Sequence, residues 1–112
     1  MTADDTSEII QRALGEFELR STQVEVLNST DHCNAKIVTD SGDYCLKILA
    51  PGYSEGRLRS QMKFADFLRN GGLPIPAPLE TTAGHRFATM FAAGEARFGR
   101  TFRLRRESVC LK

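Results

Sequence analysis

Tyr44-Cys-Leu-Lys-Ile-Leu49 predicts a β-strand, and Pro51-Gly52 ends it. Period-two alternation places Tyr44, Leu46 and Ile48 on one face and Cys45, Lys47 and Leu49 on the other. Lys47 therefore carries a charge between apolar neighbours. Such a lysine either lies on a solvated face, with its stem along the sheet, or has an anionic partner that offsets its desolvation.

A helix is predicted over residues 54 to 70, with Ser54 as its N-cap and Asn70-Gly71-Gly72 at its end. Its apolar stripe consists of Leu58, Met62, Phe64, Ala65 and Leu68. Gln61 falls within this stripe. A buried amide needs a hydrogen-bond partner, and Lys47 on the sheet is a candidate. The alternative, which the pattern alone favours, is that Gln61 bonds a backbone group or reaches water at the edge of the helix.

The remaining pattern predicts an α+β fold. A first helix is expected over about residues 6 to 14, and strands over 23–27, 35–39, 87–91 and 97–104. Asp40-Ser-Gly-Asp43 and Ala92-Ala-Gly-Glu95 have the composition of hairpin turns, and Pro74-Ile-Pro-Ala-Pro78 must run extended. Residues 23–49 leave no room for crossover helices, so we expect an antiparallel sheet of about five strands, with the long helix packed against it.

Length and composition limit the chain to one small domain. It has 112 residues, 15 Lys and Arg against 14 Asp and Glu, and 41% hydrophobic residues. This is too small for two lobes with a cleft between them.

The sequence contains no apolar run of bilayer length, and its N-terminus is polar and acidic, so we expect a cytoplasmic protein without membrane contact. The widely spaced Cys33, Cys45 and Cys110 are expected to be reduced, without a zinc site or a disulfide framework.

The loop Asn28-Ser-Thr-Asp-His-Cys-Asn34 is a candidate anion site. Its short polar side chains can bond their own backbone and leave N–H groups directed at an anion. The sequence has no G-x-x-x-x-G-K-[ST] loop, no G-x-G-x-x-G and no nucleophile elbow.

These features together resemble the N-terminal lobe of the aminoglycoside phosphotransferase family, which has the protein-kinase-like fold, and in particular its hydroxylysine-kinase-like members. The resemblance rests on the polar loop with Ser29, Asp31 and Asn34, on Tyr-x-Leu-Lys47, and on the helix that runs into Gly72-Leu-Pro-Ile-Pro-x-Pro78. It implies phosphate contact by Lys47, a nucleotide-covering loop at Ser29, Asp31 and Asn34, and Gln61 as the partner of the lysine. It also implies ATP or GTP with Mg²⁺ as cofactor, and a small hydroxyl- or amino-bearing substrate. Residues 1–104 would form this lobe, and residues 105–112 a divergent basic tail.

The sequence departs from the family pattern in two ways. Gln61 stands where most members have Glu, and it supplies no charge. The catalytic H-G-D motif and the metal-binding Asp of the family belong to a C-terminal lobe, and neither His32 nor His85 has the H-G-D context. We therefore expect no catalytic residue and no metal ligand in this chain, and no catalysis by the chain alone. The chain looks truncated or frameshifted near the end of the last strand of this lobe, which forms the adenine hinge in the family.

Two other functions are open at this stage. The first is a non-enzymatic interaction module that uses an exposed sheet face, with self-association or a complementing chain as its partner. The second is nucleic-acid binding by the basic residues after position 96, which is less favoured because such a charge run is more often a solvated end.

Overall fold

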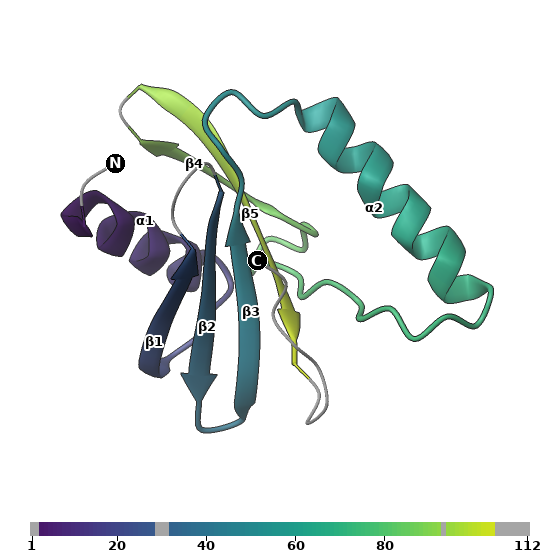
Figure 1. Cartoon of the computed structure of the whole chain (residues 1–112), viewed down its shortest axis with the longest axis horizontal. Coiled ribbons are helices and arrows are strands. Elements are labelled where there is room, and N and C mark those ends of the chain that lie inside the picture. Colours follow the sequence, from purple (N-terminus) through teal and green to yellow (C-terminus); the bar gives the residue numbers. More distant parts are fainter. Residues whose placement is uncertain (1–2, 29–31, 93, 105–112) are drawn as a thin grey trace.

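One five-stranded antiparallel sheet forms the centre of the molecule (Figure 1). In this computed structural model, which describes residues 3–28, 32–92 and 94–104, the strand order is β1-β2-β3-β5-β4. The elements are α1 (Ala3–Glu16), β1 (Ser21–Asn28), β2 (Cys33–Thr39), β3 (Gly42–Ile48), α2 (Glu55–Asn70), β4 (Ala88–Ala92) and β5 (Glu95–Arg103). The predicted α+β class, antiparallel pairing and five strands are confirmed.

Both predicted hairpins form. Thr39 pairs with Gly42 between β2 and β3, and Ala92 pairs with Glu95 between β4 and β5. Gly42 has φ 137°, and a Cβ there would lie 2.9 Å from a guanidinium nitrogen of Arg103. A side chain at this position would therefore be strained and would displace Arg103.

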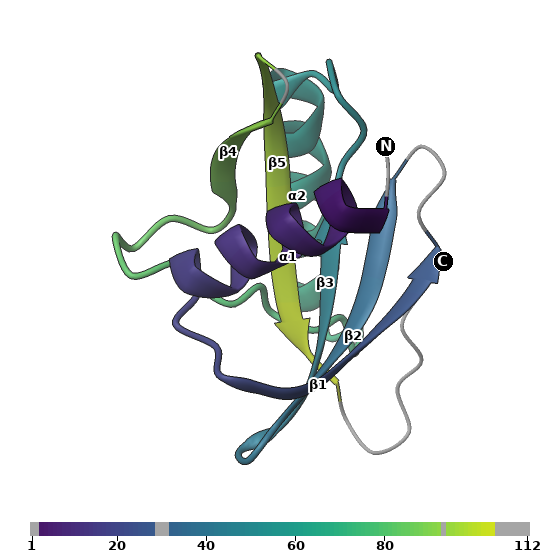
Figure 2. The ribbon, with the colours of Figure 1, turned by 90° about the vertical axis from the view of Figure 1, so that its left-hand side faces the viewer.

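The two helices lie on opposite faces of the sheet (Figures 1 and 2). α1 begins three residues earlier than expected and buries Ile9, Ile10, Ala13 and Leu14 against one face. The strands meet it with buried side chains from every second position, which are Cys33, Ala35, Ile37, Tyr44, Leu46, Ile48, Ala88 and Met90. Alternation along β3 thus places Leu46 in this core and turns Lys47 toward the face with α2.

α2 covers the other face over a smaller area. Its N-terminus is capped as predicted, since the Ser54 hydroxyl accepts a hydrogen bond from the Arg57 backbone N–H at 3.2 Å. Only Leu58 and Met62 of α2 are buried. They join a second core cluster with Leu49, Phe87 and Phe98.

The predicted apolar stripe of α2 is therefore only partly buried. Phe64 and Phe67 are 62% and 72% exposed. Figure 1 shows why: α2 slants away from the sheet toward its C-terminal end, so its second half has no strand beneath it. The expectation that Phe64 faces a core is wrong for this reason.

The cysteines differ from expectation at one position. Cys33 is a buried free thiol, and Cys110 lies outside the described residues. Cys45, however, is disulfide-bonded, contrary to the prediction of three reduced thiols. That prediction was made from the spacing of the cysteines along the sequence, which does not give the distances between their side chains in the folded chain.

Candidate functional site

Three polar side chains form a row across the sheet, on the face toward α2. Asn34 of β2 lies opposite Lys47 of β3, and Lys47 lies opposite Arg100 of β5. Direct cross-strand partners point to the same side of a sheet, with Cβ atoms about 4.5–5.5 Å apart. The register therefore brings together two predicted site residues and one cation that the sequence analysis did not select.

The two cations of this row are partly buried and lie close to each other. Burial lowers the pKa of Lys47, and the positive charge of Arg100 lowers it further. Burial also lowers the pKa of Arg100, while Tyr53 opposes this shift. Among the described residues, neither cation forms an ion pair with a carboxylate. The sequence predicted that Lys47 would be either solvated or paired with an anion. Lys47 is instead partly buried, and it forms no ion pair within the described part of the chain.

Asn34 adds a neutral polar group beside Lys47. This residue is only 2% exposed, and its Oδ1 atom has no hydrogen-bond partner among the described residues. An unpaired buried carbonyl costs about 1–3 kcal/mol, so this position favours a donor from Lys47 or from a ligand. Ser29 and Asp31, the other two residues of the predicted loop site, lie outside the described residues.

Gln61 lies on α2 but is exposed rather than buried. Its Nε2 atom donates a hydrogen bond to the Tyr53 hydroxyl at 2.7 Å. In the described part of the chain no hydrogen bond joins Gln61 to Lys47, so their direct pairing stays a prediction. The placement of Gln61 on a buried face is wrong because α2 diverges from the sheet, and the alternative that Gln61 reaches water at the edge of the helix agrees with its exposure.

Tyr53 connects the parts of this site, and the sequence analysis did not select it. Its ring contacts the His32 ring with centroids 5.6 Å apart, and the Arg57 guanidinium lies 5.3 Å from its centroid. The His32 Nδ1 atom in turn accepts a hydrogen bond from the Ala50 backbone N–H at 2.8 Å. Tyr53 thus joins the start of α2 to the chain that leads into β2. The sequence signal that could have identified Tyr53 is its position directly after Pro51-Gly52. An aromatic side chain at such a turn can contact both the preceding strand and the following helix.

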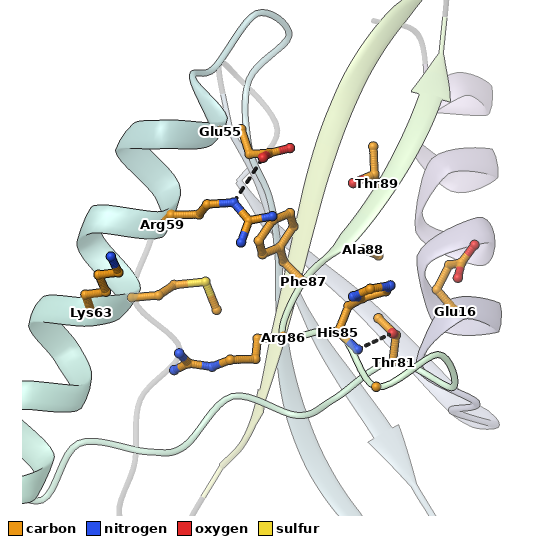
Figure 3. A pocket seen from close by; sticks show the side chains of 12 residues that line it. Glu16, Glu55, Arg59, Lys63, Thr81, His85, Arg86, Phe87, Ala88 and Thr89 are labelled. Atoms are coloured by element: carbon orange, nitrogen blue, oxygen red, sulfur yellow. Dashed lines mark hydrogen bonds and ion pairs between the residues drawn. The ribbon is translucent and has the colours of Figure 1, made fainter.

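One cavity beside α2 does not contain the predicted site residues. It has a volume of about 650 Å³ and lies between α2 and the chain that leads into β4 (Figure 3). Its lining includes the ion pair of Arg59 with Glu55, and the Arg59 guanidinium lies 5.1 Å from the centre of the Phe87 ring. Charges of both signs line this cavity, and it presents no concentrated charge to a ligand.

A second cavity lies beside Arg100. It has a volume of about 210 Å³ and is lined by α2, by residues 75–78 and by β5. Arg69 lines it from α2, and Arg100 lines it from β5. The Arg69 Nη1 and Arg100 Nε atoms are buried, and neither has a hydrogen-bond partner in the part of the chain that the structure describes.

An arginine–aspartate cluster fixes the second half of α2. Asp66 accepts two hydrogen bonds from Arg86, at 2.7 and 2.6 Å, and also pairs with Arg69. The bonds from Arg86, followed by those from Arg69, hold the pKa of Asp66 below its ordinary value. This cluster joins α2 to the segment that leads into β4, because Arg86 lies 20 residues after Asp66 in the sequence.

The stability of the chain should therefore depend on pH through Asp66. Its pKa is lower when folded than when unfolded, so its stabilising effect is complete above the ordinary value of 3.8. The effect is lost as the pH falls through the folded-state value. We expect urea denaturation curves at stepped pH to show this loss for the wild type but not for Asp66→Asn. The exposed loop variant Asp40→Asn is the control and should retain it.

Comparison with known structures identifies the architecture. An amicoumacin kinase, solved in complex with AMP-PNP, Ca²⁺ and Ami, superposes with a TM-score of 0.77 at 17% sequence identity. The match covers 89% of this chain and 31% of that one. The fold is that of a kinase-like N-terminal lobe. A microcompartment-associated aminopropanol kinase gives the same TM-score at 18% identity, over 88% of this chain and 31% of that one.

This kinase-like lobe thus spans about a third of the length of the two kinases. Its sequence matches no protein-family model and no curated protein. Within the described ranges, the lobe contains no group of three His, Cys, Asp or Glu side chains arranged to hold a metal ion. Across those same ranges, no helix has the length and apolar character needed to cross a bilayer.

Proposed function

We propose that residues 1–104 are the nucleotide-binding N-terminal lobe of a cytoplasmic small-molecule phosphotransferase. Its donor would be ATP or GTP with Mg²⁺, and its acceptor a hydroxyl group of an amino compound such as hydroxylysine or an aminoglycoside. The main support is Lys47, a partly buried cation without a carboxylate partner among the described residues, on the third strand of a kinase-like lobe. An anion such as a phosphate would supply the missing partner.

The other predicted residues receive roles consistent with their positions. Asn34 lies beside Lys47 on β2, and Ser29 and Asp31 belong to the preceding segment that we propose to cover the phosphates. Gln61 uses its N–H group on Tyr53, which leaves its carbonyl oxygen available to accept a hydrogen bond from the Lys47 ammonium. Gln61 is therefore the α2 residue that we propose to position Lys47.

Phosphoryl transfer needs a group that orients the acceptor hydroxyl and a metal held between phosphate oxygens. Mg²⁺ would supply charge neutralisation of the phosphates when bound. Since the catalytic H-G-D motif is not in the sequence, the contribution of this lobe is to bind and orient the nucleotide. Lys47 would donate to phosphate oxygens, and the Asn34 carbonyl oxygen could accept a hydrogen bond from the Lys47 ammonium and so orient it.

A direct binding measurement tests this function. Titration of the chain with ATP, and separately with GTP, should give saturable one-to-one binding by calorimetry in the presence of Mg²⁺. With hydroxylysine added, no phosphorylated product is expected from the chain alone. Failure to bind either nucleotide at millimolar concentration would refute the proposal, and turnover that Lys47→Ala abolishes would show that the chain is an enzyme by itself.

A second function, that of an interaction module, is favoured by one observation on α2. Phe64 and Phe67 expose large apolar rings on its outer half, and such rings together are typical of a surface that another protein covers. Light scattering over a concentration series distinguishes the two functions. A monomer that binds nucleotide supports the phosphotransferase lobe, and concentration-dependent association without nucleotide binding supports the module.

A further inference from the structure

Arg100 is the charged group beside Lys47 for which no role has yet been given. It lies directly opposite Lys47 on β5, so the two long side chains extend from the same face of the sheet. We infer that Arg100 is a second phosphate-binding residue and that, with Lys47, it forms a site for two neighbouring phosphate groups of a di- or triphosphate. This inference rests on the proposed function and adds to it a residue and a ligand class.

Two like charges in adjacent cross-strand positions repel each other, and partial burial increases the cost. The ion pairs of the described residues do not relieve this repulsion. Their carboxylates are engaged elsewhere: Asp66 with Arg69 and Arg86, Asp43 with Lys36, Glu55 with Arg59, and Glu8 with Arg12. A ligand with at least two negative charges would relieve it.

Two buried arginine N–H donors lie in the same region as the positive charges of Lys47 and Arg100. The Nε atom of Arg100 is buried and has no partner within residues 3–28, 32–92 and 94–104, and this side chain lines the 210 Å³ cavity, which is open to solvent. Arg69, which lines the cavity from α2, also has a buried nitrogen without a partner in those ranges. Unpaired buried donors are rare in folded proteins, and a bound group that accepts them removes the cost.

The residue types favour a chain of phosphates over a single one. A guanidinium presents several N–H groups in a planar fork that matches phosphate oxygens, whereas an ammonium acts as a compact point charge. Placed side by side, Lys47 and Arg100 can each engage a different phosphate. Gln61 supplies no charge from α2, and the helix carboxylates Glu55 and Asp66 form their ion pairs with arginines rather than with the lysine.

Inorganic anions test the inference without involving the base or sugar of a nucleotide. Binding of tripolyphosphate, pyrophosphate and orthophosphate is measured by calorimetry for the wild type, Lys47→Met, Arg100→Met and the double variant. We expect wild-type affinity to rise from orthophosphate to tripolyphosphate. Arg100→Met should weaken tripolyphosphate binding about tenfold or more, and orthophosphate binding much less.

Two further variants control for folding and for general charge. Arg100→Gln retains N–H donors without the charge and should also weaken tripolyphosphate binding, so the test does not depend on a single substitution. Arg12→Met removes an exposed cation of α1, on the opposite side of the sheet, and should leave binding unchanged. Circular dichroism verifies that each variant is folded.

The outcomes separate the inference from the function on which it rests. If Lys47→Met weakens tripolyphosphate binding and neither Arg100 variant does, Arg100 has no phosphate role and the inference is overturned, while the nucleotide-binding function stands. If the affinities of the wild type for the three anions are equal, the two-phosphate site is also overturned. If no Lys47 or Arg100 variant changes the binding of ATP or of tripolyphosphate, both proposals fail.

Discussion

Lys47→Met is expected to weaken ATP binding by about 10- to 100-fold, because it removes a charge-assisted hydrogen bond to phosphate worth roughly 1.5–3 kcal/mol. Methionine keeps most of the length and apolar stem of the lysine, so packing against the neighbouring strands is preserved. The substitution also removes the repulsion between Lys47 and Arg100. The variant should therefore be at least as stable as the wild type while binding nucleotide poorly.

Calorimetric titration with ATP and a thermal unfolding curve for each protein measure the two effects separately. Lys36→Met is a matched control, since Lys36 also belongs to the sheet but pairs with Asp43 at 3.7 Å. Its ATP affinity should remain close to that of the wild type. Equal ATP affinities for Lys47→Met and the wild type would exclude Lys47 from the phosphate site.

Leu46→Ala is expected to destabilise the fold by about 2–5 kcal/mol. Leu46 is fully buried in β3, the central strand of the sheet, where it packs in the core beneath α1. Truncation leaves a cavity that hydrogen-bonded neighbouring strands cannot easily close. For a domain of this size, the expected fall in Tm is about 8 °C or more.

Urea and thermal denaturation of Leu46→Ala and Leu73→Ala provide the comparison. Leu73 follows α2 and is 50% exposed, so its truncation should change the free energy of unfolding by no more than about 0.5 kcal/mol. Similar losses in the two variants would mean that the face of β3 toward α1 is not the main core.

The fold could be predicted because its signals are local. Alternation along residues 44–49 separates Leu46 from Lys47, and the serine and glycine residues that flank α2 mark its ends. Each of these signals depends on a few neighbouring residues. The elements therefore occur where they were expected, with ends shifted by up to three residues.

The site was harder to predict, because its geometry depends on distant parts of the chain. Lys47 could be selected as a charge in an apolar strand, but its neighbour Arg100 is set by the register of β3 with β5, across 53 positions of sequence. The exposure of Gln61 depends on the angle between α2 and the sheet, which helical periodicity does not contain. The bond from Gln61 to Tyr53 follows from that same angle.

The residues of the polar row come from three strands joined side by side by backbone hydrogen bonds. The positions of their backbones are consequently set when the protein folds, before any ligand arrives. An arriving anion would therefore order only the Lys47 and Arg100 side chains, which are long and lose rotamer entropy when they are held. Recognition of phosphate by this molecule would thus spend its ordering cost on two side chains rather than on the backbone that carries them.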